Sequence, residues 1–145
     1  MIPRITIVTL GTRDFDRALR FYRDGLGFPT RAKEGDPIAF FRTGGTRLAL
    51  YPLQGLADDI APGTPIPAPG FAGITLAHNV QRREEVAEVL ELARRSGGTI
   101  LRPAQDAFWG GHHGYFADPD GHPWEVAWGP MFSFSPNGEL VIDEG

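Results

Sequence analysis

The chain has 145 residues, no cysteine, and 14 lysine and arginine residues against 18 aspartate and glutamate residues, for a net charge of −4. Without cysteine, the protein has no disulfide, thiolate metal ligand or cysteine nucleophile. The acidic balance and the lack of a basic run argue against nucleic acid or an anionic membrane as a partner, and the length suits one domain or two small modules that share a core.

Two further absences concern location. No apolar run approaches the roughly 20 residues that a membrane span requires. The N-terminal residues Met1 to Arg4 are not followed by the apolar core and small residues of a signal peptide. We therefore expect a soluble, cytoplasmic protein with no membrane partner.

The first half of the chain predicts the element order β-α-β-β-β. Residues 5–10 form an apolar, β-branched run of strand length. Asp14 can cap the helix that follows, on which apolar residues recur at helical spacing until Gly25. Three short strands are expected after this helix, at residues 30–33, 38–42 and 47–53.

Prolines interrupt this pattern at positions 62, 65, 67 and 69. Each proline removes a backbone donor and fixes φ, so residues 55–70 are expected to form an extended linker, with a helical turn near 57–60 as an alternative within it.

The second half repeats the order of the first. A strand at 72–80, a helix at 82–96, a strand at 99–101 and a hairpin at 115–128 are expected. We interpret residues 1–145 as one domain, with module one at 4–54, the linker at 55–70, module two at 71–128 and a C-terminal tail at 129–145.

The segment 103–114 is rich in glycine and aromatic residues. It is either a mobile segment that covers a site or a surface loop pinned by Phe108 and Trp109.

Glu125 stands out in the hairpin because it is a carboxylate among apolar neighbours. Strand alternation places Trp124, Val126 and Trp128 on one side, where the tryptophans suit core packing, and Glu125 on the other. A charged group in such a strand is either exposed or placed in a cavity for use.

Two stretches carry a family resemblance. Residues 9–28, TLGTRDFDRALRFYRDGLGF, and 115–125, YFADPDGHPWE, resemble the vicinal oxygen chelate superfamily of glyoxalases, bleomycin resistance proteins and dioxygenases. The resemblance implies an α+β fold in which two βαβββ modules form a curled mixed sheet around a cleft, as in glyoxalase and dihydroxybiphenyl dioxygenase. It also implies a homodimer.

The same resemblance implies four metal-ligand positions, which fall on or near Ile7, Ala49, Gly73 and Glu125. Only Glu125 has a ligating side chain, so we expect no metal and no other cofactor. One alternative divalent metal set joins Glu125 to His112 and His113. His78 is expected to point away from the cleft.

Alternation leaves an apolar cleft with a few polar points, which is typical of small-molecule sites. The predicted ligand-binding residues are Ile7, Thr9, Ala49, Tyr51, Thr75, Phe108, Trp109 and Glu125. We expect a protein that sequesters or carries an organic ligand, as bleomycin resistance proteins do.

The sequence leaves open whether the protein is an enzyme. One alternative is a lyase, isomerase or oxidoreductase that uses Glu125 as a general base or with a divalent metal. Another is a structural protein whose cleft is filled by its own side chains.

Overall fold

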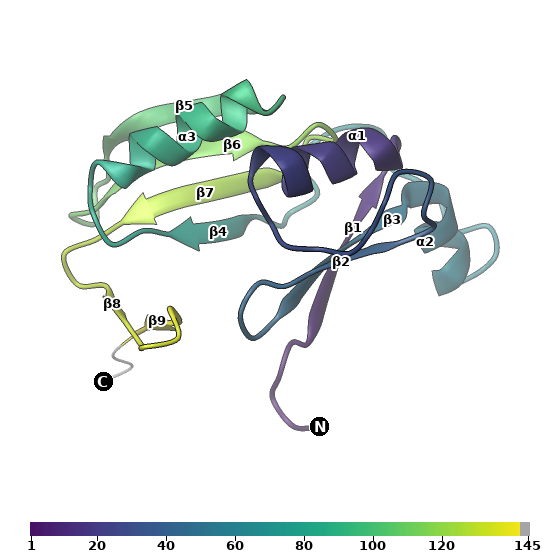
Figure 1. Cartoon of the computed structure of the whole chain (residues 1–145), viewed down its shortest axis with the longest axis horizontal. Coiled ribbons are helices and arrows are strands. Elements are labelled where there is room, and N and C mark those ends of the chain that lie inside the picture. The colour runs from purple at the N-terminus through teal and green to yellow at the C-terminus, as the bar shows by residue number, and fades with distance from the viewer. Residues whose placement is uncertain (143–145) are drawn as a thin grey trace. The chain divides into compact units, whose positions relative to one another are not determined.

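The structure is a computed structural model that describes residues 1–142. The chain divides into two compact units, Met1–Gly70 (unit 1) and Phe71–Gly145 (unit 2). Each unit has its own open sheet with a helix packed against it, so the α+β fold expected from the sequence is confirmed (Figure 1). None of the helices in residues 1–142 is long and apolar enough to cross a membrane.

Unit 1 contains a three-stranded sheet in the order β1-β3-β2. Strands β1 and β3 are parallel, and β2 is antiparallel to β3. The elements in chain order are β1 (Ile7–Thr12), α1 (Phe15–Arg20), the π-helical turn η1 (Phe21–Gly25), β2 (Ala39–Phe41), β3 (Arg47–Pro52) and α2 (Leu53–Ile60).

Helix α1 begins where the sequence predicts, directly after Asp14. The Asp14 carboxylate accepts a hydrogen bond from the backbone N–H of Arg17 at 3.0 Å, which satisfies a donor that the helix leaves free. The apolar stripe continues into η1, where Tyr22 is fully buried and its ring lies 5.8 Å from that of Phe41. Packing on the sheet therefore stabilises this short helix.

The strand expected at residues 30–33 does not form. The segment lies beside β2 and is joined to it by two hydrogen bonds. The N–H of Arg42 donates to the Pro29 carbonyl, and the Thr30 hydroxyl donates to the Phe40 carbonyl at 2.7 Å. Because Thr30 also accepts from the N–H of Ala32, its side chain takes the place of regular backbone pairing.

The helical turn expected near residues 57–60 is part of a longer helix, α2, which occupies residues 53–60, so the linker begins later than predicted. This helix packs closely on the sheet, since a Cβ built on Gly11 would lie 2.5 Å from Leu53 Cδ1 and one on Gly55 would lie 3.2 Å from the Tyr51 ring. Close packing that depends on two glycines has no signature in helical periodicity. The proline-rich residues 61–70 form no helix or strand, as expected.

Unit 2 contains a four-stranded sheet in the order β4-β7-β6-β5, in which only β4 and β7 are parallel. The arrangement repeats that of unit 1, where residues 29–32 take the place of β5. The elements are β4 (Leu76–Asn79), α3 (Glu85–Arg95), β5 (Thr99–Asp106), β6 (His112–Ala117), β7 (Pro123–Trp128), β8 (Ser133–Phe134) and β9 (Leu140–Val141).

The hairpin between β6 and β7 is confirmed. Its turn is held by the Asp118 carboxylate, which accepts the backbone N–H groups of Asp120 at 3.0 Å and His122 at 2.9 Å. Gly121 has φ +90°, which a residue with a Cβ rarely adopts. This turn pairs Tyr115 with Glu125 across the two strands.

Helix α3 covers one face of this sheet (Figure 1). Val126 is fully buried there, and Phe116 stacks on Trp124 with centroids 6.0 Å apart. Trp124 is therefore core, as predicted, whereas Trp128 is only half-buried and donates from Nε1 to the Gln81 carbonyl. His78, opposite Val126 in the register, faces the helix side as expected.

The predicted mobile segment is mostly sheet. Strand β5 extends to Asp106 and β6 begins at His112, because Gln105 and Asp106 pair with the two histidines. The remaining residues 107–111 form a tight turn closed by backbone hydrogen bonds from Ala107 to Gly111 and from Gly110 to Ala107.

Gly114 of β6 lies close to Leu90 of α3, and it provides a test of this packing. A Cβ on Gly114 would lie 2.5 Å from Leu90 Cδ1 and 2.8 Å from the Arg102 carbonyl. We expect Gly114→Ala to lower the free energy of unfolding by about 1–3 kcal/mol, measured by urea denaturation. Gly70→Ala is the control, since nothing lies within 4 Å of that position; equal effects of the two changes would contradict the packing.

Candidate functional site

Helix α3 covers one face of the sheet of unit 2. The opposite face, which we call the open face, carries the polar side chains of the hairpin. Strand pairing places Ala77, Glu125, Tyr115 and Arg102 in one row across the four strands. The neighbouring row carries His113. Since side chains alternate along each strand, this set lies opposite the buried residues beneath α3.

Glu125 is not isolated, because His113 is its partner. Nδ1 of His113 lies 2.8 Å from Oε1 of Glu125, and the two side chains are 15% and 25% exposed. An ionised carboxylate only accepts hydrogen bonds, so Nδ1 carries the proton. In the neutral imidazole, Nε2 is then left as a hydrogen-bond acceptor and a base.

Tyr115 completes this polar group. Its ring centroid lies 5.7 Å from that of His113. Burial raises the pKa of the Tyr115 phenol, and the charge of Glu125 and a hydrogen bond to it raise that pKa further. The hydroxyl therefore stays a proton donor well above neutral pH.

Trp109 packs beside this group at the edge of the sheet. Its ring meets that of His113 edge-on at 5.9 Å and stacks on Phe132 of the tail at 5.9 Å. A Cβ on Gly111 would collide with the Trp109 ring, and one on Gly129 would lie 3.1 Å from it. Two glycines thus allow the indole to lie close to the backbone, and the tail contacts the body of unit 2 through Phe132.

A depression of about 560 Å³ adjoins the polar group. Small-molecule sites commonly enclose about 300–1,000 Å³. The depression is lined by Leu101, Arg102, Gln105, Asp106, Ala107, Phe108, His113 and Tyr115. Phe108 is fully exposed.

His112 belongs to the opposite face of the sheet. Its Nδ1 lies 2.8 Å from Oδ1 of Asp106, which also pairs with Arg83. The Arg83 guanidinium, and then His112, hold the pKa of Asp106 below its usual value. Because adjacent strand residues point to opposite faces, the structure does not bring His112 and His113 together at Glu125.

The chain does not fit the metal site that the resemblance implies. Ile7, Ala49 and Gly73 have no ligating side chain, and Ala49 is fully buried. Within residues 1–142, no three histidine, cysteine, aspartate or glutamate side chains are grouped to hold a metal ion. We derive no metal chemistry from this donor set.

The other predicted ligand-binding residues are divided between the units. Ile7, Thr9, Ala49 and Tyr51 alternate onto one face of β1 and β3 in unit 1; Ile7 and Thr9 are exposed, and Tyr51 packs on Gly55. Thr75 precedes β4 and is exposed. In unit 2, Trp109 lies next to the group around Glu125, and Phe108 lines the adjoining depression.

Sequence reasoning placed His113 beside Glu125 only in the alternative metal set, and it missed the hydrogen-bonded pair and Tyr115 as a further partner. The signal was present, since a hairpin closed at residues 118–121 pairs Tyr115 with Glu125 and sets His113 on the same face. The prediction that residues 103–114 form a loop obscured this pairing.

Comparisons with known proteins agree with this fold. A family model described as Glyoxalase/Bleomycin resistance protein/Dioxygenase superfamily matches residues 4–126. The structure of a glyoxalase-related enzyme from Fulvimarina pelagi is 35% identical, with a TM-score of 0.86, and the match covers 97% of this chain and 99% of that one.

Two other solved structures are similar over most of their length. A glyoxalase/bleomycin resistance protein/dioxygenase from Nocardioides is 25% identical with a TM-score of 0.74, covering 97% of this chain and 91% of its own. Lactoylglutathione lyase from Agrobacterium tumefaciens is 26% identical with a TM-score of 0.67, covering 92% and 98%. No protein of curated function matches the chain.

The environment of Tyr115 predicts a titration. We expect the difference in phenolate absorbance between the protein and Tyr115→Phe to have its midpoint above the ordinary value of 10.0, and Glu125→Gln to lower that midpoint. Because the folded pKa exceeds the unfolded one, the linked stability is complete below the unfolded pKa and decreases as pH rises through the folded pKa. A midpoint unaffected by Glu125→Gln would contradict the proximity of the two groups.

Proposed function

The chain belongs to the glyoxalase/bleomycin resistance protein/dioxygenase superfamily, and from that premise we propose that it binds a small organic molecule at the open face of unit 2. The observation that carries the proposal is the Glu125–His113 pair, held at 2.8 Å beside a depression that His113 and Tyr115 line. A half-buried polar pair that adjoins a concave surface is a common feature of ligand sites.

The chemistry of the pair indicates the kind of ligand. With Nδ1 engaged by Glu125, Nε2 of a neutral His113 accepts a hydrogen bond, and the oxygen of the Tyr115 hydroxyl, whose proton is donated to Glu125, can accept another. A ligand with two N–H or O–H donors, such as the NH₂ group of a primary amide, would satisfy both residues.

Aromatic side chains favour a planar ligand. The exposed Phe108 lines the depression, and Trp109 borders His113 from the adjacent turn. Stacking on such rings contributes about 0.5–1.5 kcal/mol beyond the burial of area. We therefore propose a planar amide or a similar molecule as the ligand class, bound by sequestration or as cargo. The family resemblance also supports a homodimer as the working form.

The proposal is tested with benzamide as the probe. We expect benzamide to perturb the amide NMR signals of β6 and β7, and Glu125→Gln to weaken its binding about tenfold, because the carboxylate no longer selects the His113 tautomer. Glu88→Gln on the exposed side of α3 is the matched control. If both variants bind benzamide as the unaltered protein does, Glu125 has no part in binding.

Native mass spectrometry provides an independent measurement. Protein purified without a tag is expected to carry a retained ligand, and the same spectra report the mass of the assembly. If Glu125→Gln retains the ligand as the unaltered protein does, the ligand is bound at a site other than the open face of unit 2.

A second candidate function is acid–base catalysis, which the orientation of His113 favours. A carboxylate that holds Nδ1–H leaves Nε2 free to remove a proton, and a positioned general base contributes about 10²–10⁴-fold to a rate. The reaction class would be proton abstraction next to a carbonyl group.

Deuterium exchange separates the two functions. Exchange at the α-carbon of phenylacetone in D₂O is expected to be faster with the protein and to lose that acceleration in His113→Gln and Glu125→Gln. If Glu125→Gln binds benzamide normally but loses the exchange, the enzyme hypothesis replaces the binding hypothesis. If the protein never accelerates exchange of this ketone, the catalytic reading loses its support.

A further inference from the structure

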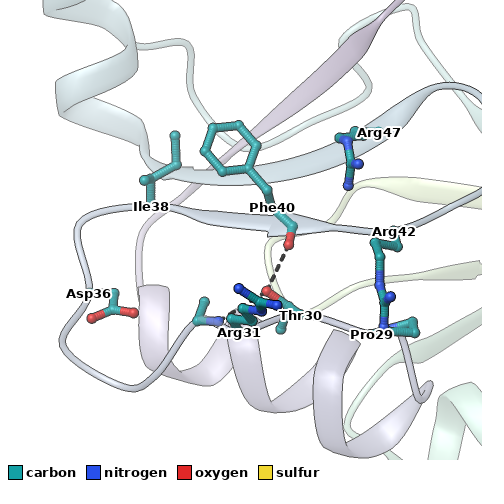
Figure 2. Close-up of a pocket in the computed structure, with 9 residues that line it drawn as sticks. Pro29, Thr30, Arg31, Asp36, Ile38, Phe40, Arg42 and Arg47 are labelled. Carbon is teal, nitrogen blue, oxygen red and sulfur yellow. Dashed lines mark hydrogen bonds between the residues drawn. The ribbon is translucent and has the colours of Figure 1, made fainter.

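Unit 1 has a depression of its own at the equivalent place on its sheet. It encloses about 580 Å³ between β2 and the irregular segment that runs beside that strand (Figure 2). The lining residues are Pro29, Thr30, Arg31, Ala32, Asp36, Ile38, Phe40, Arg42 and Arg47.

Three arginines from three neighbouring segments line this depression. Arg31 comes from the irregular segment, Arg42 directly follows β2, and Arg47 begins β3 (Figure 2). All three are exposed, and across residues 1–142 none of them forms an ion pair with an acid. In a protein of net charge −4, this local excess of positive charge is unusual.

The paired arginines of the same unit show the contrast. Arg20 lies 3.0 Å from Glu34, and Arg23 lies 2.7 Å from Asp24. Acidic side chains are therefore available nearby, yet they neutralise other cations. The guanidinium groups around the depression remain free to bind an anion.

One carboxylate lines the depression, and it is already engaged. Oδ2 of Asp36 accepts the backbone N–H of Lys33 at 2.8 Å. The balance is thus three cations against one anion. Like charges gathered around one concave surface repel one another, and a bound anion removes that repulsion.

The wall between the arginines is apolar. Phe40 is 44% exposed, and Ile38, which directly precedes β2, lies on the same side because the two residues are two positions apart. The backbone at Phe40 is held by the hydrogen bond from the Thr30 hydroxyl at 2.7 Å, drawn in Figure 2. An exposed ring beside guanidinium groups suits a ligand that has both an apolar body and an anionic group.

We propose that this depression is a second binding site, which takes a small organic anion with a carboxylate or phosphate group on an aromatic or aliphatic body. The site is independent of Glu125 and of the function proposed for unit 2. The arginines would bind the anionic group through their N–H donors, and Phe40 would contact the apolar body.

The test uses phenyl phosphate, benzoate, inorganic phosphate and benzyl alcohol as probes, with binding followed by amide NMR. We expect phenyl phosphate or benzoate to perturb residues 29–47, and benzyl alcohol, which lacks the charge, to leave them unchanged. Phenyl phosphate binding tighter than benzoate identifies phosphate as the preferred group, and the reverse order identifies carboxylate. Tighter binding of either aryl anion than of inorganic phosphate supports the contribution of Phe40.

Single charge removals supply the decisive comparison. We expect Arg42→Gln and Arg47→Gln each to weaken binding about tenfold, because each removes charge-assisted hydrogen bonds. Arg4→Gln, which removes the same charge from an exposed arginine outside the depression, should have no effect. Glu125→Gln should also leave this binding intact, so the site stands or falls separately from the function of unit 2.

Three results would overturn the proposal. One is an equal loss of binding in Arg4→Gln, which would indicate nonspecific charge attraction. Another is perturbation confined to β6 and β7, which would place the anion on unit 2. The third is the absence of any perturbation of residues 29–47 by both aryl anions at low salt, where electrostatic binding is strongest.

Discussion

The Asp118 turn determines the register of β6 against β7, and the open face of unit 2 depends on that register. Two backbone N–H groups donate to one carboxylate, so the turn closes at a defined residue and Tyr115 faces Glu125. A slip of β7 by one residue against β6 would exchange the two faces of β7. Glu125 would then lie beneath α3, away from Tyr115 and His113, and Trp124 would lie on the open face.

The same constraint explains why the open face can hold polar groups at low cost. Helix α3 buries Val126 and Trp124, so that face supplies the apolar stabilisation of the sheet. Glu125 and His113 satisfy each other at 2.8 Å, and their partial exposure limits the cost of desolvation. The fold can therefore keep Glu125 and His113 on this face at little cost in stability.

The repeated module provides two versions of one surface. In both units a depression lies beside the first strand of an antiparallel pair, β2 of the pair β2–β3 and β6 of the pair β6–β7. Unit 2 presents His113 and Tyr115 there, whereas unit 1 presents three arginines and Phe40. The two units share the strand order, and they differ in the side chains at this surface and in the irregular residues 29–32 that take the place of β5. Different chemistry on one strand order is expected when function resides in sites carried by a common fold.

The sequence by itself determined the repeat, the capped helix at Asp14, the hairpin at 115–128 and the face on which Glu125 lies, because hydrophobic periodicity and turn chemistry are local. Only the tertiary structure decided that α2 forms, that residues 30–33 lack regular pairing, and that β5 and β6 extend through the glycine-rich segment. These outcomes depend on contacts between residues distant in sequence, such as Leu53 on Gly11. The pairing of Glu125 with His113 belongs to the same class, because it requires the register of two strands as well as the identity of the residues.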